Sequence, residues 1–129
     1  YDVDIAGTIL KPNMVTPGSE SEQRATVEEV AEMTIKCLKE TVPNELPGVA
    51  FLSGGQTEIE STQHLDMMNK IGGFSWKLSF SYGRALQQSA LNAWLGKLEN
   101  KSAAQDAFAH RAKMNKLASL GSWSADLEK

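Results

Sequence analysis

The sequence predicts an α/β fold in which parallel strands alternate with helices. Three observations support it: short apolar runs, a turn of small or polar residues after each run, and a helical pattern after each turn. This alternation is typical of βαβ units, which form parallel sheets. The three strands are expected to begin almost at Tyr1, at Gly48 and near Trp76. Because parallel strands point the same way, the turns that follow them should gather at one edge of the sheet.

Capping signals set the beginnings of the first two helices. Thr26 and Thr57 occupy positions suited to an N-cap. A glutamate follows each threonine three residues later, Glu29 in one case and Glu60 in the other. This spacing predicts a capping box at the start of each helix.

Breakers and apolar spacing define the remaining helical segments. The first helix should end near Thr41, before Pro43, and the second at Gly72-Gly73. Two further helices are expected over residues 84–95 and 102–120. The residues expected to be buried are Val27, Val30, Ala31, Cys37 and Leu38 in the first helix, Leu65 and Met68 in the second, and Ala104, Ala107, Phe108, Met114, Leu117 and Ala118 in the last. Trp123 and Leu127 are expected in a short tail that docks back.

The bulk composition of the 129 residues limits the classes of function. A net charge of −3 leaves no basic surplus for binding nucleic acid or an anionic membrane. No apolar run approaches the roughly 20 residues of a membrane span, and no secretory leader opens the chain. Cys37 is the only cysteine, so no internal disulfide can form. We therefore expect a cytoplasmic protein with a buried structural thiol.

The chain begins inside a strand-like run, Tyr1–Ile5, without an initiator methionine. We therefore expect residues 1–129 to be a single partial domain cut from a longer protein. Three parallel strands would leave two open sheet edges, which invite aggregation unless something covers them.

Lys11 is the first candidate for chemistry. It follows Ile9-Leu10 and precedes Met14 and Val15, so its neighbours are typical of a buried strand. Burial would lower the lysine pKa from about 10.4, and a lysine with a pKa of ~7–8 can attack a carbonyl and form a Schiff base. A lysine whose stem packs while its ammonium reaches water fits the same segment. These residues alone leave both interpretations open.

Two further turns suit a phosphate. Ser53-Gly54-Gly55 follows the second strand, Ser81-Tyr82-Gly83-Arg84 follows the third, and each turn leads into a helix. Such a turn presents free backbone N–H groups at a helix N-terminus, which favours anion binding. Arg84 adds a planar guanidinium that matches phosphate geometry. Together with Lys11, the two turns predict a substrate that carries both a carbonyl and a phosphate.

No other polar residue receives a role. His64 and His110 lie on polar faces of helical patterns and are expected to be solvated. No Cys/His cluster has the spacing of metal ligands, and a lysine amine makes a Lewis acid unnecessary, so neither a metal nor a cofactor is expected. Trp94, Phe108 and Trp123 are expected in the core or at subunit contacts.

Four stretches of the chain closely resemble class I fructose-1,6-bisphosphate aldolases. They are Gly7-Thr8-Ile9-Leu10-Lys11-Pro12-Asn13-Met14-Val15-Thr16-Pro17-Gly18, Phe51-Leu52-Ser53-Gly54-Gly55-Gln56, Phe80-Ser81-Tyr82-Gly83-Arg84-Ala85-Leu86-Gln87, and Ser89-Ala90-Leu91 with Ala93-Trp94, Gly96-Lys97 and Glu99-Asn100. The resemblance spans nearly the whole chain but only about the final third of the family's length. It implies the C-terminal portion of a (β/α)8 TIM barrel, strands six to eight with their helices.

The resemblance also implies roles for individual residues. Lys11 would be the Schiff-base lysine, and the residues that bind a substrate phosphate would be Ser53, Gly54, Gly55, Ser81, Gly83 and Arg84. The implied activity is that of a glycolytic and gluconeogenic lyase, which cleaves fructose 1,6-bisphosphate to dihydroxyacetone phosphate and glyceraldehyde 3-phosphate. The implied partners are further copies of the chain or a complementary N-terminal segment. The family's proton-transfer carboxylates lie on earlier strands, and its tyrosine-ended tail has no counterpart here.

Two other functions stay open. A non-catalytic fragment that binds sugar phosphate or a complementary chain would keep the same half of a site. Another lysine-dependent barrel aldolase, such as a transaldolase, would share the lysine. The Ser-Gly-Gly-Gln and Tyr-Gly-Arg stretches argue against that second possibility.

Overall fold

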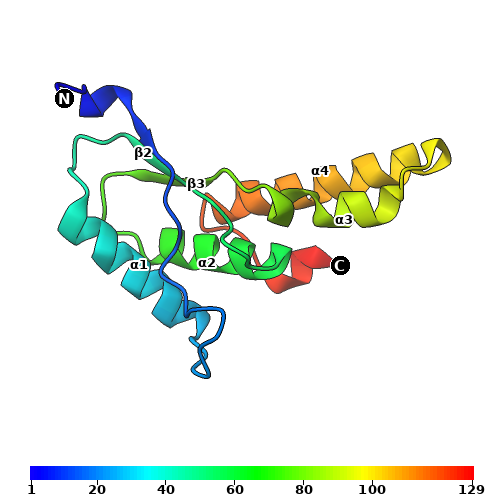
Figure 1. The fold of residues 1–129 in the computed structure, drawn as a ribbon, viewed down its shortest axis with the longest axis horizontal. Helices are drawn as coiled ribbons and strands as arrows, with labels where there is room; N and C mark the ends of the chain where they lie inside the picture. The colour runs from blue at the N-terminus through cyan, green and yellow to red at the C-terminus, as the bar shows by residue number, and fades with distance from the viewer.

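The computed structural model describes residues 1–129 and contains one three-stranded parallel sheet. The strands lie in the order β1-β2-β3, with the bounds β1 (Ile9–Leu10), β2 (Gly48–Phe51) and β3 (Lys77–Phe80). In the register of the sheet Leu10 lies opposite Val49, and Phe51 lies opposite Phe80. The parallel arrangement confirms the predicted α/β alternation and brings the carboxyl ends of the strands to one edge (Figure 1).

Four α-helices and three short 3-10 segments complete the chain. They are η1 (Ile5–Gly7), α1 (Val27–Thr41), α2 (Glu58–Ile71), α3 (Arg84–Trp94), η2 (Leu98–Asn100), α4 (Lys101–Ala118) and η3 (Ala125–Glu128). Both predicted capping boxes are confirmed: Thr26 Oγ1 accepts the Glu29 N–H, and Thr57 Oγ1 accepts the Glu60 N–H, each at 3.2 Å. Gly72, with a φ of 64°, ends α2 as predicted. No helix is both long enough and apolar enough to span a bilayer.

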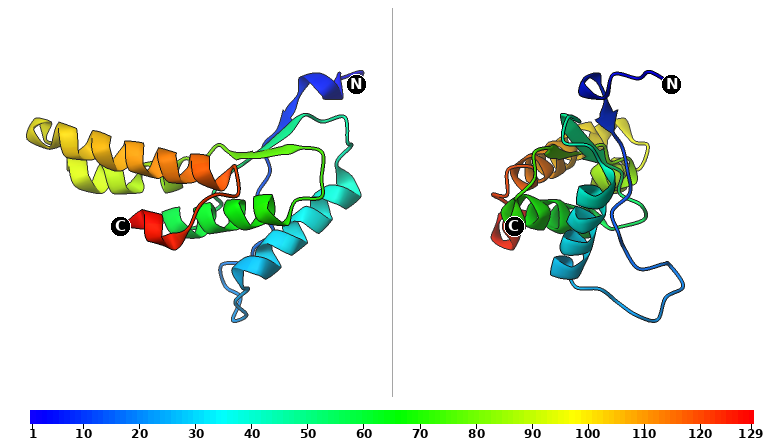
Figure 2. Two further views of the ribbon diagram at one scale, coloured as in Figure 1. Left: turned by 180° about the vertical axis from the view of Figure 1, so that it is seen from behind. Right: turned by 90° about the vertical axis from the view of Figure 1, so that its left-hand side faces the viewer.

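The helices form two groups around the sheet. Figures 1 and 2 show α1 and α2 lying together on one side of the sheet, while α3 and α4 run side by side and extend away from it as an arm. The core is shared by β2, β3, α1, α2 and the last turns of α4. Leu65 and Met68 are completely buried, as predicted, and Met114 and Ala118 bring α4 into the same core.

The C-terminal tail docks back onto α2 and α4, which confirms that prediction. Trp123 is 7% exposed, and its backbone N–H donates to Asp66 Oδ1 at 2.9 Å. Lys70, which pairs with Asp66 at 2.5 Å, donates to the Trp123 carbonyl at 3.0 Å. These contacts attach the end of the chain to α2.

One carboxylate, Glu128, attaches the tail to α4. The Arg111 guanidinium reaches both Glu128 oxygens, at 2.9 and 2.7 Å, and the Trp123 indole N–H donates to the same carboxylate at 2.9 Å. His110 Nε2 lies 3.3 Å away. Because of this pairing Arg111 is buried within a helix face that the sequence predicted to be apolar.

The N-terminal residues differ from the predicted early strand. Residues 5–7 form the 3-10 segment η1, and Asp4 accepts the Ala6 N–H at 3.1 Å. Aspartate commonly caps a turn in this way, because its short carboxylate reaches its neighbours' backbone N–H groups. The first strand is therefore only two residues long.

The expected burial around this strand is also wrong. Ile9 is 63% exposed, and Leu10 and Val15 are also exposed, so only Met14 joins the core. β1 is an edge strand that pairs with β2 alone, and α1 and α2 pack against the central part of the sheet. An edge strand without a covering helix cannot bury its side chains.

Three further expectations about helix faces are corrected. Cys37 is exposed on α1, where Thr34 and Ile35 are the buried residues instead. His64, expected to be solvated, is 8% exposed on α2. Phe108 is 41% exposed, because α3 and α4 lean on each other and lack a third layer over that face.

Candidate functional site

The predicted site lies at the edge where the three strands end. The Leu52 N–H donates to the Pro12 carbonyl at 3.0 Å, and the Ser81 N–H donates to the Phe51 carbonyl at 2.8 Å. These bonds continue the two ladders just past the assigned strands. Lys11 and the turns that begin at Ser53 and Ser81 are therefore neighbours along one edge.

Lys11 is exposed, and its ammonium has no carboxylate within 4.0 Å. Of the two interpretations that the sequence left open, the structure shows the lysine that reaches water, because β1 is the uncovered edge strand. Its position at the end of β1, at the same end of the sheet as the two turns, is as predicted, and the strand order places it beside the turn after β2.

The turn after β2 is shaped by two glycines with positive φ. Gly54 has a φ of 53° and Gly55 a φ of 84°. A Cβ atom on Gly54 would lie 2.3 Å from Oδ1 of Asn13, so the lysine segment packs directly on this turn. The Gln56 N–H closes the turn by donating to the Ser53 carbonyl at 2.9 Å.

Several donors at this edge have no partner within the chain. The backbone N–H groups of Gly54, Gly55 and Gly83 make no hydrogen bond, and neither does the Ser53 hydroxyl. The Ser81 N–H is already used in the ladder, so Ser81 can offer only its hydroxyl. Free N–H groups on a glycine-rich turn before a helix suit an anion.

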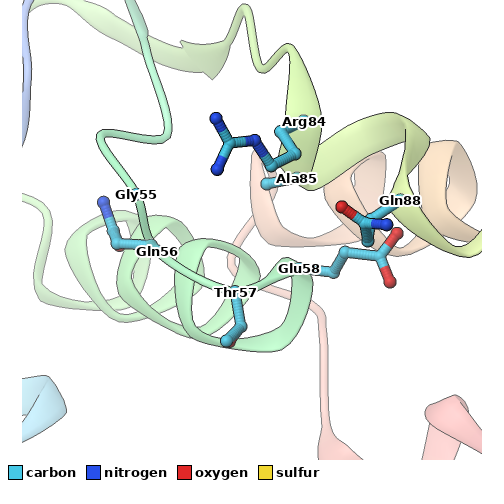
Figure 3. Close-up of a pocket in the computed structure, with 7 residues that line it drawn as sticks. All are labelled: Gly55, Gln56, Thr57, Glu58, Arg84, Ala85 and Gln88. Atoms are coloured by element: carbon cyan, nitrogen blue, oxygen red, sulfur yellow. The ribbon is translucent and has the colours of Figure 1, made fainter.

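Arg84 begins α3 and forms no ion pair. Its guanidinium extends across the gap between α3 and the loop at Gly55 (Figure 3). A cavity of about 260 Å³ lies there, lined by Gly55, Gln56, Thr57, Glu58, Arg84, Ala85 and Gln88. The structure thus brings the second predicted turn next to the first.

Tyr82 holds the turn after β3 in place. It is buried, and its hydroxyl donates to the Ser61 carbonyl at 2.8 Å. Burial raises the pKa of Tyr82 far above its ordinary value, so the side chain stays neutral. Ser81 and Gly83, on either side of it, are therefore turned outward and exposed.

Sequence reasoning missed the polar contacts that support the first turn. His64 Nδ1 lies 2.6 Å from Gln56 Oε1, and burial lowers the pKa of His64 despite the nearby Glu60 carboxylate. The pKa of Glu60 is lowered in turn, chiefly by its hydrogen bond from the Thr57 N–H. The sequence showed Thr57 and Glu60 as a capping pair, but no pattern in the neighbouring residues predicted that His64 is buried.

A second polar cavity, of about 280 Å³, lies on the other side of this turn. It is lined by Thr16, Pro17, Gly18, Ser19, Arg24, Ala25, Gly54, Gly55, Gln56, Glu60 and His64. Neither here nor elsewhere in the chain is a group of three or more His, Cys, Asp or Glu side chains placed to hold a metal ion.

Comparison with known proteins gives a consistent match over the whole chain. The family model described as "Fructose-bisphosphate aldolase class-I" matches residues 1–129. A protein of Xylella fastidiosa named "Probable fructose-bisphosphate aldolase class 1" is 53% identical over 123 residues, which are 95% of this chain and 37% of that protein. "Fructose-bisphosphate aldolase 4, cytosolic" of Arabidopsis thaliana is 51% identical over 129 residues and 33% of its own length.

A solved structure shares the fold. It is a fructose-bisphosphate aldolase from Plasmodium falciparum in complex with TRAP and a small molecule inhibitor. The TM-score is 0.88 at 48% identity, over 91% of this chain and 34% of that one. The parallel sheet and its helices are therefore those of part of an aldolase barrel.

The chain thus spans about a third of the length of the relatives it matches. Three of the four stretches that resemble aldolases in sequence form the strand ends and the two turns, and the fourth lies in α3 and η2. By its sequence and its fold, the chain belongs to the class-I fructose-bisphosphate aldolase family.

Proposed function

We propose that the protein carrying this chain cleaves fructose 1,6-bisphosphate through a Schiff base on Lys11. One observation carries the proposal: in a chain of this family, an unpaired lysine ends one strand beside a turn whose N–H groups are free. A lysine nucleophile and an anion site at neighbouring strand ends suit a phosphorylated ketone.

In the proposed reaction the neutral Lys11 amine attacks the ketone carbon and water leaves, which forms an iminium. The iminium accepts the electron pair of the C3–C4 bond as that bond breaks, while a base takes the proton of the C4 hydroxyl. Glyceraldehyde 3-phosphate departs, and the enamine is protonated and hydrolysed to dihydroxyacetone phosphate. Covalent catalysis of this kind replaces one difficult step by easier ones. The resemblance places the proton-transfer carboxylates outside the segment that this chain covers.

We propose that Ser53, Gly54, Gly55, Ser81, Gly83 and Arg84 hold one substrate phosphate. The free N–H groups of the glycines and the unpaired guanidinium support this assignment. Binding a phosphate remote from the reacting carbon positions the ketone against the lysine.

We also propose that residues 1–129 are one partial domain of this protein, with a sugar phosphate as ligand and further copies or the N-terminal part of the barrel as partners. A cytoplasmic location is supported by relatives named cytosolic and cytoplasmic, although a chloroplastic aldolase of Oryza sativa is also 51% identical.

The second candidate, a non-catalytic fragment, is favoured by one observation. β1 and β3 each pair with β2 alone, so both sheet edges are open, and Ile9 at one edge is 63% exposed. Open parallel edges call for a covering segment. A fragment of this kind would bind a complementary chain and would not turn over substrate.

Borohydride trapping distinguishes the two candidates. In the intact protein, dihydroxyacetone phosphate with borohydride should add a reduced adduct to Lys11, which peptide mass spectrometry locates. The Lys11→Met variant should fold, take up no adduct and lose cleavage by several orders of magnitude. Near-normal turnover in a folded Lys11→Met protein would exclude the Schiff-base role.

A further inference from the structure

His64 and Gln56 connect the turn after β2 to the lysine segment. His64 lies on the second turn of α2, is 8% exposed, and has its Nδ1 atom 2.6 Å from Gln56 Oε1. Gln56 Nε2 lies 3.6 Å from the Met14 sulfur. A thioether can only accept a hydrogen bond, so the Gln56 amide must turn its NH2 group toward Met14. The amide oxygen then faces His64, and Nδ1 of that histidine carries the proton.

This arrangement joins two loops that come from different strands. Met14 lies three residues after Lys11 and is 3% exposed, whereas Gln56 directly follows the Ser-Gly-Gly turn. The side chain of Gln56 bridges the two, and His64 fixes the rotation of its amide. Asn13, packed against Gly54, makes a second contact between the same loops.

We propose that His64 and Gln56 are positioning residues that set the distance between the Lys11 amine and the phosphate-binding turn. The proposal rests on the proposed function, since it assigns a purpose to the link between the two halves of that site. A displacement of about 1 Å in a reacting group can cost about 100-fold in rate. The strand ladder ends with the bond from the Leu52 N–H to Pro12, and beyond it the contacts of Gln56 with Met14 and of Gly54 with Asn13 link the lysine segment to the turn.

The consequence is specific to substrates that carry a phosphate. A ketone without a phosphate reaches Lys11 without using the turn, so the contacts of His64 and Gln56 should not change its reaction with the lysine. Dihydroxyacetone phosphate uses both groups at once and depends on the distance between them. A contact that merely stabilised the fold would affect the two ketones equally.

The test measures borohydride trapping of Lys11 in the intact protein with dihydroxyacetone phosphate and with dihydroxyacetone. The quantity compared is the ratio of the two trapping efficiencies. His64→Leu should lower this preference for the phosphorylated ketone by about 10-fold or more. His64→Asn should keep this preference within about 3-fold of the wild-type value, because the asparagine amide places an N–H donor close to where Nδ1 lies.

Gln63→Leu is the matched control, since Gln63 neighbours His64 on α2 and makes no side-chain hydrogen bond. It should leave the preference unchanged. If His64→Leu does not fold, Gln56→Leu tests the same link from a half-buried loop position and should lower the preference equally.

Each outcome decides a separate question. No trapping of wild-type Lys11 by either ketone would remove the proposed function itself. Normal trapping in the wild type with an unchanged preference in His64→Leu and Gln56→Leu would overturn the positioning role. An equal loss with both ketones, or a failure of His64→Asn to rescue, would show that the contact serves only the fold.

Discussion

At the scale of single residues, the candidate site at the carboxyl ends of the strands contains groups that are left unpaired. Arg84 has no carboxylate partner, and the N–H groups of Gly54, Gly55 and Gly83 donate to nothing within the chain. Unpaired donors at an accessible position remain available to a ligand without first breaking an internal bond. The proposed phosphate site would therefore need no internal bond to break before an anion binds.

Replacing Arg84 with alanine tests which phosphate it holds. Each charge-assisted hydrogen bond contributes about 1.5–3 kcal/mol, so the loss should raise KM or lower kcat/KM at least about 10-fold. Because Arg84 begins the helix after β3, at the same edge as Lys11, we assign it to the C1 phosphate. Steady-state cleavage of fructose 1,6-bisphosphate and fructose 1-phosphate should then suffer alike. A loss confined to the bisphosphate would move Arg84 to the C6 phosphate.

Gly54→Ala tests the contact between the two loops. The new Cβ would meet Asn13 Oδ1 at 2.3 Å, and an alanine at a φ of 53° costs about 1–2 kcal/mol by itself. We expect the free energy of unfolding of the intact protein, measured in urea, to fall by at least that amount. Gly18→Ala is the control, because no atom lies within 4 Å of its Cβ, and it should stay within about 0.5 kcal/mol of wild type. Equal stability of the two variants would contradict the contact.

At the scale of elements, local signals were readable in the sequence and distant partners were not. The capping boxes at Thr26 and Thr57 involve residues three apart, so their sequence spacing was enough to locate the starts of α1 and α2. The burial of Arg111 depends on Glu128, 17 residues away, and no pattern within α4 encodes that partner. His64 is the same case, because its contact with Gln56 closes only when α2 packs under the turn.

In the candidate site, too, the features set by neighbouring residues were predictable and those set by packing between elements were not. The turns after β2 and β3 were predictable, because glycine and serine after an apolar run favour a turn by their own conformational properties. The exposure of Lys11 was not predictable, because it depends on which strand lies at the edge of the sheet. Strand order follows from packing between elements, which single-sequence patterns do not contain.

The tail contacts predict a loss of stability at acidic pH. Burial acts to raise the pKa of Glu128, but the hydrogen bonds from Arg111 and Trp123 and the Arg111 charge outweigh it, so the pKa is lowered. The stabilisation is therefore complete above the ordinary glutamate value of about 4.3 and is lost as the pH falls through the lower folded value. Glu128→Gln should be less stable than wild type at pH 7 by about 1–3 kcal/mol.

Urea unfolding between pH 7 and pH 3 measures this difference. The curves of wild type and Glu128→Gln should approach each other as the pH falls toward the lowered pKa of Glu128, because its carboxylate then takes up a proton. Asp126→Asn is the control, because the Asp126–Lys129 pair is exposed on both sides and contributes little. A constant gap between wild type and Glu128→Gln at all pH values would contradict the role of the charge.

At the scale of the whole molecule, the surface is incompletely covered. β1 and β3 have free edges, and the arm made by α3 and α4 exposes Leu91, Trp94, Leu95, Leu98 and Phe108. Part of this arm forms an apolar groove of about 570 Å³ that includes Trp94 and Phe108. Apolar surface and open strand edges of this kind promote association.

We therefore expect the 129-residue chain alone to be aggregated, molten, or assembled with copies or a complementary segment, and to be inactive. Sedimentation velocity and a thermal melt of the purified chain check the first part, with the intact protein as the reference. An aldol cleavage assay on the same material checks the second. A monodisperse monomer that unfolds cooperatively would contradict the structural expectation, and cleavage at the rate of the intact protein would contradict the functional one.

The burial of Trp123 gives the tail an optical signal of its own. The indole lies in the core and shares its N–H with Glu128, so separation of the tail would place it in water. An indole that enters water emits at longer wavelength, and the two other tryptophans, Trp76 and Trp94, can be changed to phenylalanine to leave a single emitter. Fluorescence would then follow the docking of the chain end in the unlabelled protein, at concentrations low enough to avoid association.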